Sequence, residues 1–366
     1  MKVQNKDPNE EGRRVSGKKV TISDVARRAK VSKGTVSAVI NGKSNVKSST
    51  RDHILELMKE MNYRPKGTAR NLRGEHPEKS IGLILKDISY PFYTAIAAGA
   101  KEYAASKGYA VVVAGSDDDV ENEKKLTRLF SAKDIKGAII APVVAGTAEF
   151  EHLYMLKMVN YPFVLLEDVQ GIQANVVAID NIKAVKRAVK YLIENGHQRI
   201  VHFAGPPHSS HTMERVEGFR YAFSESPLVF GKENIVYAGS HYDEAYQKTI
   251  EYFNERPRSE YPTAIVCFND HQALAVMCAL RELKIRMPED ISLVGIDDIY
   301  YAQMYPIPLT TIRAPQHDIG MRAAEILIRN IESQHILPIE RVVLETEFVI
   351  RETTRSISAP GSSVPA

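Results

Sequence analysis

The chain has 366 residues, of which 44% are hydrophobic and 25% charged, a balance typical of a soluble globular protein with two or three domains. Its two cysteines, Cys267 and Cys278, stand in no metal-binding spacing, so we predict no zinc site and no structural disulfide. No apolar run approaches the ~20 residues of a membrane helix, and the polar N-terminus lacks a secretory pattern. We therefore expect a cytoplasmic protein with no membrane partner.

The net charge of +3 conceals an uneven distribution along the chain. Residues 1–79 carry 19 Lys and Arg against 9 Asp and Glu, a net charge of +10, which leaves −7 for the remainder. A basic head on an acidic body indicates that the head meets nucleic acid. A solvated basic tail is the alternative that charge alone leaves open.

The head is predicted over residues 18–63, behind a polar tail at 1–17 that has the composition of a disordered segment. Thr21 and Asp24 have the spacing of a capping box at the start of a first helix. Ser32 can cap a second helix, and a third is expected over 48–62. The apolar face of the third helix is predicted to hold Ile54, Leu55, Met58 and Met61.

Two short helices joined by a tight turn predict a helix-turn-helix, whose second helix lies in the major groove of DNA. The residues that would face base edges or phosphates are Ser32, Lys33, Gly34, Thr35 and Ser37. A lysine can reach guanine acceptors, and hydroxyl groups can meet phosphates or bases. A three-helix domain without a DNA role is the alternative.

From Ser80 the pattern changes to short Val- and Ile-rich runs that alternate with amphipathic helices. The runs are IGLILKD, AVVVAGS, GAIIAP, FVLLED, VVAID, IVHFAG, IVYAG, AIVCFN, ISLVGIDD and RVVLETEFVI. Such runs are typical of βα units in parallel sheets that are buried on both faces. They are too many for one open sheet of ordinary size, so we predict two α/β lobes, each a parallel sheet flanked by helices. The tail at 356–366 is predicted to be disordered.

Polar and aromatic residues follow several of these strands, where small-molecule sites of α/β folds lie. Phe92 and Tyr93 could stack on a ring. Carboxylate and amide groups that suit hydrogen bonds to hydroxyls end four strands, at Glu167, Asp180, Asn269 and Asp297. Two structural alternatives stay open, in which Phe92 is a core residue and Asp297 is a helix cap.

The stretch TISDVARRAKVSKGTVSAVINGKSNVKSSTRDHILELMKEMNYRP closely resembles the DNA-binding head of the lactose-repressor (LacI/GalR) family. The similarity continues through ARNLR, YPFY, YLIENGHQRI, ISLVGIDD, PLTTIR and VIRETTR, and so spans about residues 20–355. It implies a helix-turn-helix head, a hinge over 64–79, and a two-lobed body over 80–355 like that of periplasmic sugar-binding proteins. The lobes are expected at about 80–177 plus 313–341, and at 178–312 plus 342–355.

The resemblance assigns roles to residues of the head and hinge. It implies DNA-backbone contacts at Thr21, Ser32, Asn41, Thr50 and Tyr63, with Ile22 also among the DNA-binding residues. Base choice within the family varies mainly at Lys33 and Gly34. In the hinge, Leu72, with Ala69 beside it, would wedge into the minor groove, while Arg73 would meet phosphates. A flexible linker whose leucine docks on the body is the alternative.

Two residues of the head depart from the family pattern. Lys30 stands where the family has a turn glycine, and Ala38 stands where it commonly has an arginine on the recognition helix. Because alanine cannot hydrogen-bond a base, we expect the operator to differ from the commonest family site.

In the body, the resemblance places effector contacts on the loop after Gly205. The positions implied there are Ser209, His211 and Met213, with Arg215 at the end of the loop, and His241 matches a position that is often aromatic in the family. For His211, an exposed loop histidine is the alternative. Met213 stands where sugar-binding members often carry an arginine, which argues against a simple sugar bound in the usual way.

These observations predict a homodimeric, sequence-specific transcription repressor that binds a pseudo-palindromic operator and responds to a small molecule, a sugar or sugar derivative. Ligand binding would close the cleft and shift the DNA-binding equilibrium. A regulator controlled by a protein corepressor is an alternative, and a solute-binding transport protein is another. An enzyme is disfavoured because no GxGxxG, GxxxxGK[ST], HExxH or GxSxG motif occurs, so we expect no catalytic residue, metal or cofactor.

Overall fold

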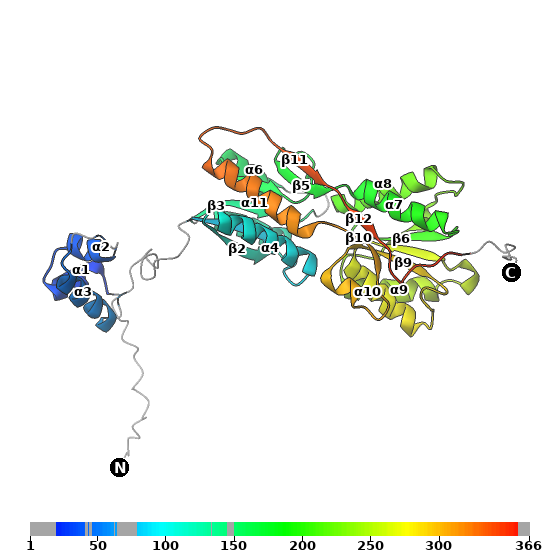
Figure 1. The fold of residues 1–366 in the computed structure, drawn as a ribbon, viewed down its shortest axis with the longest axis horizontal. Helices are drawn as coiled ribbons and strands as arrows, with labels where there is room; N and C mark the ends of the chain where they lie inside the picture. Colours follow the sequence, from blue (N-terminus) through cyan, green and yellow to red (C-terminus); the bar gives the residue numbers. More distant parts are fainter. Residues whose placement is uncertain are drawn as a thin grey trace, which may run out of the picture. The chain divides into compact units, whose positions relative to one another are not determined.

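The structure, a computed structural model, describes residues 20–40, 43, 46–61, 63, 79–132, 134–144 and 150–357 (Figure 1). The chain separates into two compact units, the head Met1–Glu78 and the body Lys79–Ala366. The predicted tail at 1–17 lies outside the described residues, as does nearly all of the hinge predicted over 64–79. The DNA-contact predictions at Asn41, Ala69, Leu72 and Arg73 therefore also fall outside them.

The head consists of three helices, α1 (Ile22–Ala29), α2 (Lys33–Ile40) and α3 (Ser48–Glu60). The backbone N–H of Thr21 donates to Asp24 Oδ2 at 3.0 Å, so the predicted cap at the start of α1 is present. The buried core is small and made mostly of aliphatic side chains: Val25, Ala26, Ala29, Val36, Val39, Ile54, Leu57 and Met58. Leu57 is buried in this core, whereas Leu55, which the sequence pattern assigned to it, is only half-buried. Helix α3 ends at Glu60 rather than at the predicted residue 62.

The body contains two six-stranded sheets, one in each lobe (Figure 1). The first sheet has the order β11-β5-β4-β3-β1-β2 and is parallel throughout. Its strands are β1 (Lys79–Leu85), β2 (Tyr109–Gly115), β3 (Ile135–Ile140), β4 (Phe163–Leu165), β5 (Asn175–Ile179) and β11 (Arg341–Leu344).

The second sheet has the order β12-β10-β9-β8-β6-β7. Its strands are β6 (Ile200–Ala204), β7 (Ile235–Tyr237), β8 (Ala264–Cys267), β9 (Ser292–Asp297), β10 (Thr310–Arg313) and β12 (Glu347–Val349). The prediction of two parallel sheets is wrong for this one, because β12 returns antiparallel to β10 and makes the sheet mixed. The threonine-rich strand β10 was absent from the predicted apolar runs.

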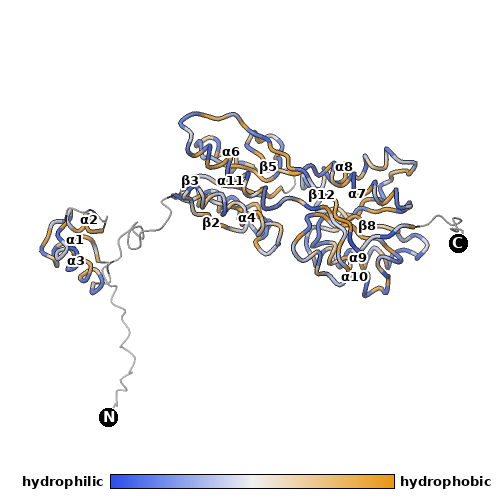
Figure 2. The backbone as a smooth tube through the Cα atoms, in the orientation of Figure 1, coloured by the Kyte–Doolittle hydropathy of each residue, from blue (hydrophilic) through white to orange (hydrophobic). Residues whose placement is uncertain are grey.

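Helices cover both faces of each sheet and bury the apolar strands, which Figure 2 shows as hydrophobic stretches inside the two lobes. The first lobe contains α4 (Pro91–Ser106), α5 (Val120–Ser131), α6 (Glu151–Met158) and α11 (Gln316–Glu332). The second contains α7 (Asn181–Glu194), α8 (Ser210–Ser224), α9 (Tyr242–Asn254) and α10 (Asp270–Glu282), with short 3-10 turns at Lys232–Asn234, Arg258–Glu260 and Tyr300–Gln303. Because each sheet is covered on both faces, its strands appear in the sequence as continuous hydrophobic runs.

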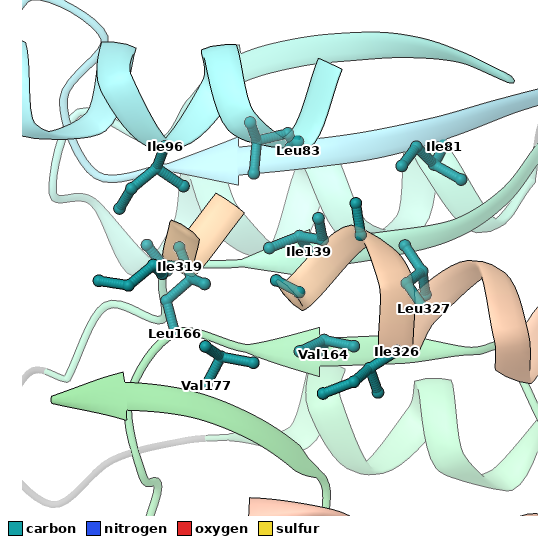
Figure 3. Close-up of a cluster of buried hydrophobic side chains, with 14 of the residues drawn as sticks. Ile81, Leu83, Ile96, Ile139, Val164, Leu166, Val177, Ile319, Ile326 and Leu327 are labelled. Atoms are coloured by element: carbon teal, nitrogen blue, oxygen red, sulfur yellow. The ribbon is translucent and has the colours of Figure 1, made fainter. Parts of the chain in front are cut away.

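The core between the first sheet and its helices α4 and α11 brings together segments from both ends of the body (Figure 3). Ile96 of α4 and Ile319 of α11 meet strand residues such as Leu83 and Ile139. Two glycines let the helices approach closely: a Cβ on Gly99 would lie 1.9 Å from the His317 carbonyl oxygen, and one on Gly320 would lie 1.9 Å from the Ile96 carbonyl oxygen. The C-terminal helix α11 is thereby fixed to the lobe that begins the body.

The chain passes between the lobes three times, after β5, after β10 and between β11 and β12. The predicted lobe boundaries need correction here. In the parallel pairing of β5 with β11, Ile179 lies opposite Leu344, so 178–179 and 342–344 belong to the first lobe, whereas Arg313 belongs to the second sheet. The run RVVLETEFVI, read as one strand, is divided between the two sheets.

The predicted disordered tail also begins too early. The backbone N–H of Ile357 donates to the Asn195 carbonyl oxygen at 2.8 Å, and the Ser356 hydroxyl donates to the side chain of the same residue. These contacts tie the first two residues of the tail to the end of α7. Among the described residues, no helix is both long and apolar enough to cross a membrane.

Candidate functional site

The head presents polar side chains on the first turn of α2. Ser32 accepts from the backbone N–H of Thr35 at 3.0 Å, which caps the helix, and the two hydroxyl oxygens lie 2.9 Å apart. Lys33 and Gly34 are exposed beside them, while Val36 points into the core. The helix start is thus held by its own polar groups while its outer side faces solvent.

The turn between α1 and α2 is tight and is formed by a non-glycine residue in the left-handed region. Lys30 has φ 55° and ψ 38°, and its N–H and that of Val31 donate back to carbonyl oxygens of α1. A left-handed conformation costs roughly 1–2 kcal/mol for a residue with a Cβ. The departure from glycine noted in the sequence therefore places strain at the turn of the motif.

The other predicted DNA contacts that the structure describes also lie on the surface of the head. Thr21 is exposed, and the half-buried residues are Ile22, Thr35, Ser37, Thr50 and Tyr63. The Arg51 guanidinium donates to the Lys43 carbonyl oxygen at 2.6 Å, which ties Lys43 to α3.

Between the two lobes of the body lies a cavity of about 390 Å³. Nine of the eleven predicted effector residues line it: Phe92, Tyr93, Glu167, Ser209, His211, Arg215, His241, Asn269 and Asp297. They come from the carboxyl ends of strands in both sheets and from the helix starts that follow, as expected for α/β folds. A cavity of this size matches the sites that bind small molecules.

Two predicted residues lie away from this cavity. Asp180 is exposed, and its Oδ1 accepts from the Lys183 backbone N–H at 2.8 Å, so it caps α7. Met213 is 56% exposed on α8 because it follows His211 by two positions and so points to a different side of the helix. Strand-end position alone did not distinguish a capping carboxylate from one that faces the cleft.

The cavity also contains residues that sequence reasoning missed, among them Lys86, Asp87, Tyr90, Asp118, His208, Ser240, Phe268 and His271. Lys86 and Asp87 end the first predicted strand, so the rule that selected Phe92 would have found them. His271 stands one residue beyond the N-terminus of α10, and a local pattern gave no signal for it.

The lining of the cavity includes a buried ion pair. Lys86 donates to Glu167 Oε1, and the other oxygen of this carboxylate accepts from the Ser210 hydroxyl at 2.8 Å. Burial alone would raise the pKa of Glu167, but His211 and Lys86 together hold it below its ordinary value. Because Ser210 belongs to the second lobe and Lys86 and Glu167 to the first, the cluster joins the two walls.

Burial lowers the pKa of His211 to about 4, against the opposing effect of Glu167, whose Oε2 lies 3.8 Å from His211 Nε2. The imidazole is therefore neutral near pH 7, and Lys86 supplies the positive charge that faces the carboxylate. With 22% of its side chain exposed, His211 belongs to the cavity wall and not to an outer loop.

A second polar group of the lining consists of Arg215 and Asp297, both of the second lobe. Arg215 Nε donates to Asn181 Oδ1 at 2.9 Å, its guanidinium lies 4.5 Å from the Phe268 ring centroid, and its Nη2 is 4.0 Å from Asp297 Oδ1. Tyr90 donates to Asp297 Oδ2 across the cleft. Burial raises the pKa of Asp297 to about 6, although Arg215 and Tyr90 oppose the shift.

The geometry bears on the two alternatives that the sequence left open, Asp297 as a helix cap and Phe92 as a core residue. Asp297 has φ 115°, a strained conformation for a residue with a side chain, and its carboxylate lines the cavity. The neighbouring Asp298 binds Arg313 and Arg351 instead. Phe92 packs against the cores of both lobes and also lines the cavity.

Comparison with known proteins agrees with this architecture. A model of the lacI family of bacterial regulatory proteins matches residues 21–66, and one of a periplasmic binding protein-like domain matches residues 189–354. The ribose operon repressor of Halalkalibacterium halodurans is 32% identical over 335 residues, which cover 92% of this chain and 97% of that protein.

Two solved structures share the whole fold. The lac repressor dimer bound to operator and the anti-inducer ONPF superimposes with a TM-score of 0.69 at 28% identity, covering 92% of this chain and 100% of the other. The transcriptional regulator CelR in complex with cellobiose gives 0.68 at 27% identity, covering 91% and 99%. The chain therefore belongs to the lacI family of bacterial regulatory proteins, as a DNA-binding repressor, not an enzyme, with a periplasmic-binding-protein-like effector body.

Proposed function

We propose that this protein is a cytoplasmic, homodimeric repressor whose affinity for a pseudo-palindromic operator is set by a carbohydrate bound in the cavity between its lobes. One observation carries the proposal: polar strand-end residues of both lobes converge on a single cavity of about 390 Å³. Asp297, Asn269 and Arg215 offer acceptors and donors that suit hydroxyl groups, and Phe92 and Phe268 offer apolar surfaces.

The names of two relatives support the class of ligand. One is a ribose operon repressor, and the other is a regulator in complex with cellobiose. The solved dimer of the lac repressor on its operator supports the proposed dimeric state. A ligand that contacts both walls favours the closed cleft. If it binds the DNA-competent and DNA-incompetent conformations with affinities that differ by ~1–3 kcal/mol, operator affinity would change 5–150-fold.

For the head, we propose that Lys33, Gly34, Thr35 and Ser37 read bases, while Thr21, Ser32, Thr50 and Tyr63 hold the DNA backbone. Their exposed or half-buried positions on one small domain support this division. The hinge segment around Leu72 and Arg73, with Ala69, would insert into the minor groove at the operator centre.

Selection of binding sites from random DNA with the full-length protein, at stated salt, tests the proposal. We expect wild-type protein to select a palindrome. Lys33→Ala should relax the base preference at one position of each half-site and weaken the binding free energy for the wild-type operator by about 1–3 kcal/mol. Lys59→Ala, on the exposed last turn of α3, is the matched control and should leave the selected sequence unchanged. Failure to enrich any sequence at low salt would refute specific DNA reading.

The effector half of the proposal is tested on the selected operator. Ribose, glucose and cellobiose are titrated into the protein–operator complex, and release or strengthened binding is followed by fluorescence anisotropy. We expect at least one of these sugars to change the affinity 5-fold or more. Arg215→Ala should abolish that response, because it removes a guanidinium that contacts both Asn181 and the cavity wall.

A further inference from the structure

The charged groups that line the cavity are already engaged with one another. The lining contains two permanent cations, Lys86 and Arg215, against four carboxylates, Asp87, Asp118, Glu167 and Asp297. Four histidines complete the set of titratable basic groups: His208, His211, His241 and His271. An anionic ligand would therefore enter a site in which carboxylates outnumber the permanent cations.

Lys86 would be the natural anchor for a phosphate or carboxylate, because it stands at the end of β1 and reaches the cavity. Its ammonium group is instead held by Glu167, and both side chains are mostly buried, with 13% and 2% exposed. To take over the positive charge of Lys86, an anion would have to displace a buried carboxylate that has no alternative cation at hydrogen-bond distance among the described residues. Leaving a buried charge without its partner costs several kcal/mol.

Arg215 is similarly occupied. Its guanidinium donates to Asn181 and to the Phe268 carbonyl oxygen, and Asp297 lies 4.0 Å away. Two of the histidines add little positive charge near pH 7, because burial lowers the pKa of His211 to about 4 and also lowers that of His271.

The geometry points to an uncharged effector and assigns Glu167 as the residue that excludes phosphorylated and carboxylated ligands by neutralising Lys86. This inference rests on the proposed function of the cavity as the effector site. The substrate class it names is an uncharged, hydroxyl-rich molecule, whose hydroxyls hydrogen-bond to Asp297 and Asn269 without disturbing the Lys86–Glu167 pair.

The test is a binding titration of the full-length protein with glucose, cellobiose, inorganic phosphate and glucose 6-phosphate, by calorimetry at pH 7.5. Wild-type protein should show no saturable binding of phosphate or glucose 6-phosphate. Glu167→Gln keeps an acceptor for Ser210 but releases Lys86, so this variant should bind glucose 6-phosphate at least tenfold more tightly than wild type. Asp118→Asn, the same change of charge on an exposed rim residue, is the matched control and should gain much less.

Several outcomes overturn the inference. Saturable binding of either anion by wild-type protein that Lys86→Gln abolishes would show that Lys86 is available despite Glu167. If Glu167→Gln and Asp118→Asn gain equally in affinity for glucose 6-phosphate, the effect is due to net charge alone. If a folded Glu167→Gln variant gains no affinity, Glu167 does not exclude anions. If Glu167→Gln does not fold, the wild-type and Lys86→Gln titrations decide.

The same titration separates this inference from the proposed function. If neutral sugars fail to bind wild-type protein while Glu167→Gln acquires anion binding, the carbohydrate effector is wrong and the exclusion of anions by Glu167 stands. If neutral sugars bind and wild-type protein also binds glucose 6-phosphate through Lys86, the effector site stands and the exclusion is wrong.

Discussion

The head and the body present their functional residues in opposite ways. In the head, the candidate DNA-reading residues from Ser32 to Ser37 follow one another within a single capped helix start, and they are exposed or half-buried. In the body, the cavity residues extend from Lys86 to Ile319, and several are almost completely buried. A surface that meets DNA can be built from local structure, whereas an enclosed ligand site requires long-range packing.

The two units also differ in how they are stabilised. The head depends on eight buried residues of modest size and on caps, so single local interactions make up a large share of its stability. Each lobe of the body has two buried clusters, one on either face of its sheet. Substitutions that disrupt packing between distant segments should therefore destabilise the body most. Substitutions that alter local backbone preferences or caps should destabilise the head most.

The largest effect is expected for Gly320→Val, which tests whether long-range helix packing holds the body. New side-chain atoms would meet the backbone of Ile96, which cannot move aside as a flexible side chain would. We expect a loss of about 3 kcal/mol or more in the free energy of unfolding, measured by urea denaturation followed by circular dichroism. Gly108→Asn is the control, because its site is open and left-handed; a comparable loss there would contradict the packing explanation.

A second prediction concerns the buried charge of the cavity. The pKa of Asp297 is about 6 in the folded protein, above its ordinary value of 3.8, so the folded state binds the proton more tightly than the unfolded state. Wild-type protein therefore loses stability as the pH rises from about 4 to about 6, and the loss is complete above that range. Asp297→Asn has no such group.

The unfolding free energy of wild type minus that of Asp297→Asn should thus fall by roughly 2–3 kcal/mol between pH 4 and pH 7.5. Parallel urea titrations at four pH values would measure it. A difference that stays constant, or that rises with pH, would show that Arg215 and Tyr90 stabilise the carboxylate at least as much as burial disfavours it.

In the head, Lys30→Gly should be stabilising by about 1 kcal/mol. Glycine adopts the left-handed conformation of this turn without the cost that lysine has. Part of this gain is offset because glycine has more backbone entropy in the unfolded chain. Hydrogen exchange of peptides from α1 to α3 in the full-length protein would report slower exchange. Lys59→Gly, inside α3, should have the opposite sign, and faster exchange in both variants would contradict the account.

The smallest effect is expected for Ser32→Ala, which removes the acceptor for the Thr35 N–H at the start of α2. The loss should be about 0.5–1 kcal/mol and confined to the head, since the cap is a hydrogen bond within the first turn of α2. Exchange measured without DNA separates this loss from any direct contact between Ser32 and the operator. Faster exchange in the cores of the lobes would show that the two units are not independent.

Much of the architecture could be read from residue patterns because those patterns are local. The capping box at Thr21, the cap at Ser32 and the runs of Val and Ile that end in polar residues each predict an element from neighbours in the chain. The same local reading failed where pairing partners decide: β10 is rich in threonine, and RVVLETEFVI is one apolar run that two different sheets share. Asp180 and Asp297 both end strands, yet only Asp297 faces the cavity.

By itself, then, the sequence determined the helix-turn-helix, the two α/β lobes, the basic head and nine of the residues around the cavity, because caps, periodicity and strand-end positions are properties of short segments. Only the tertiary structure decided that Lys86 is paired with Glu167, that Tyr90 crosses the cleft to Asp297, and that His211 lies partly buried beside Glu167. These pairings join residues that are about 40 to 200 positions apart in the chain. Their charge states depend on burial, which no local pattern encodes.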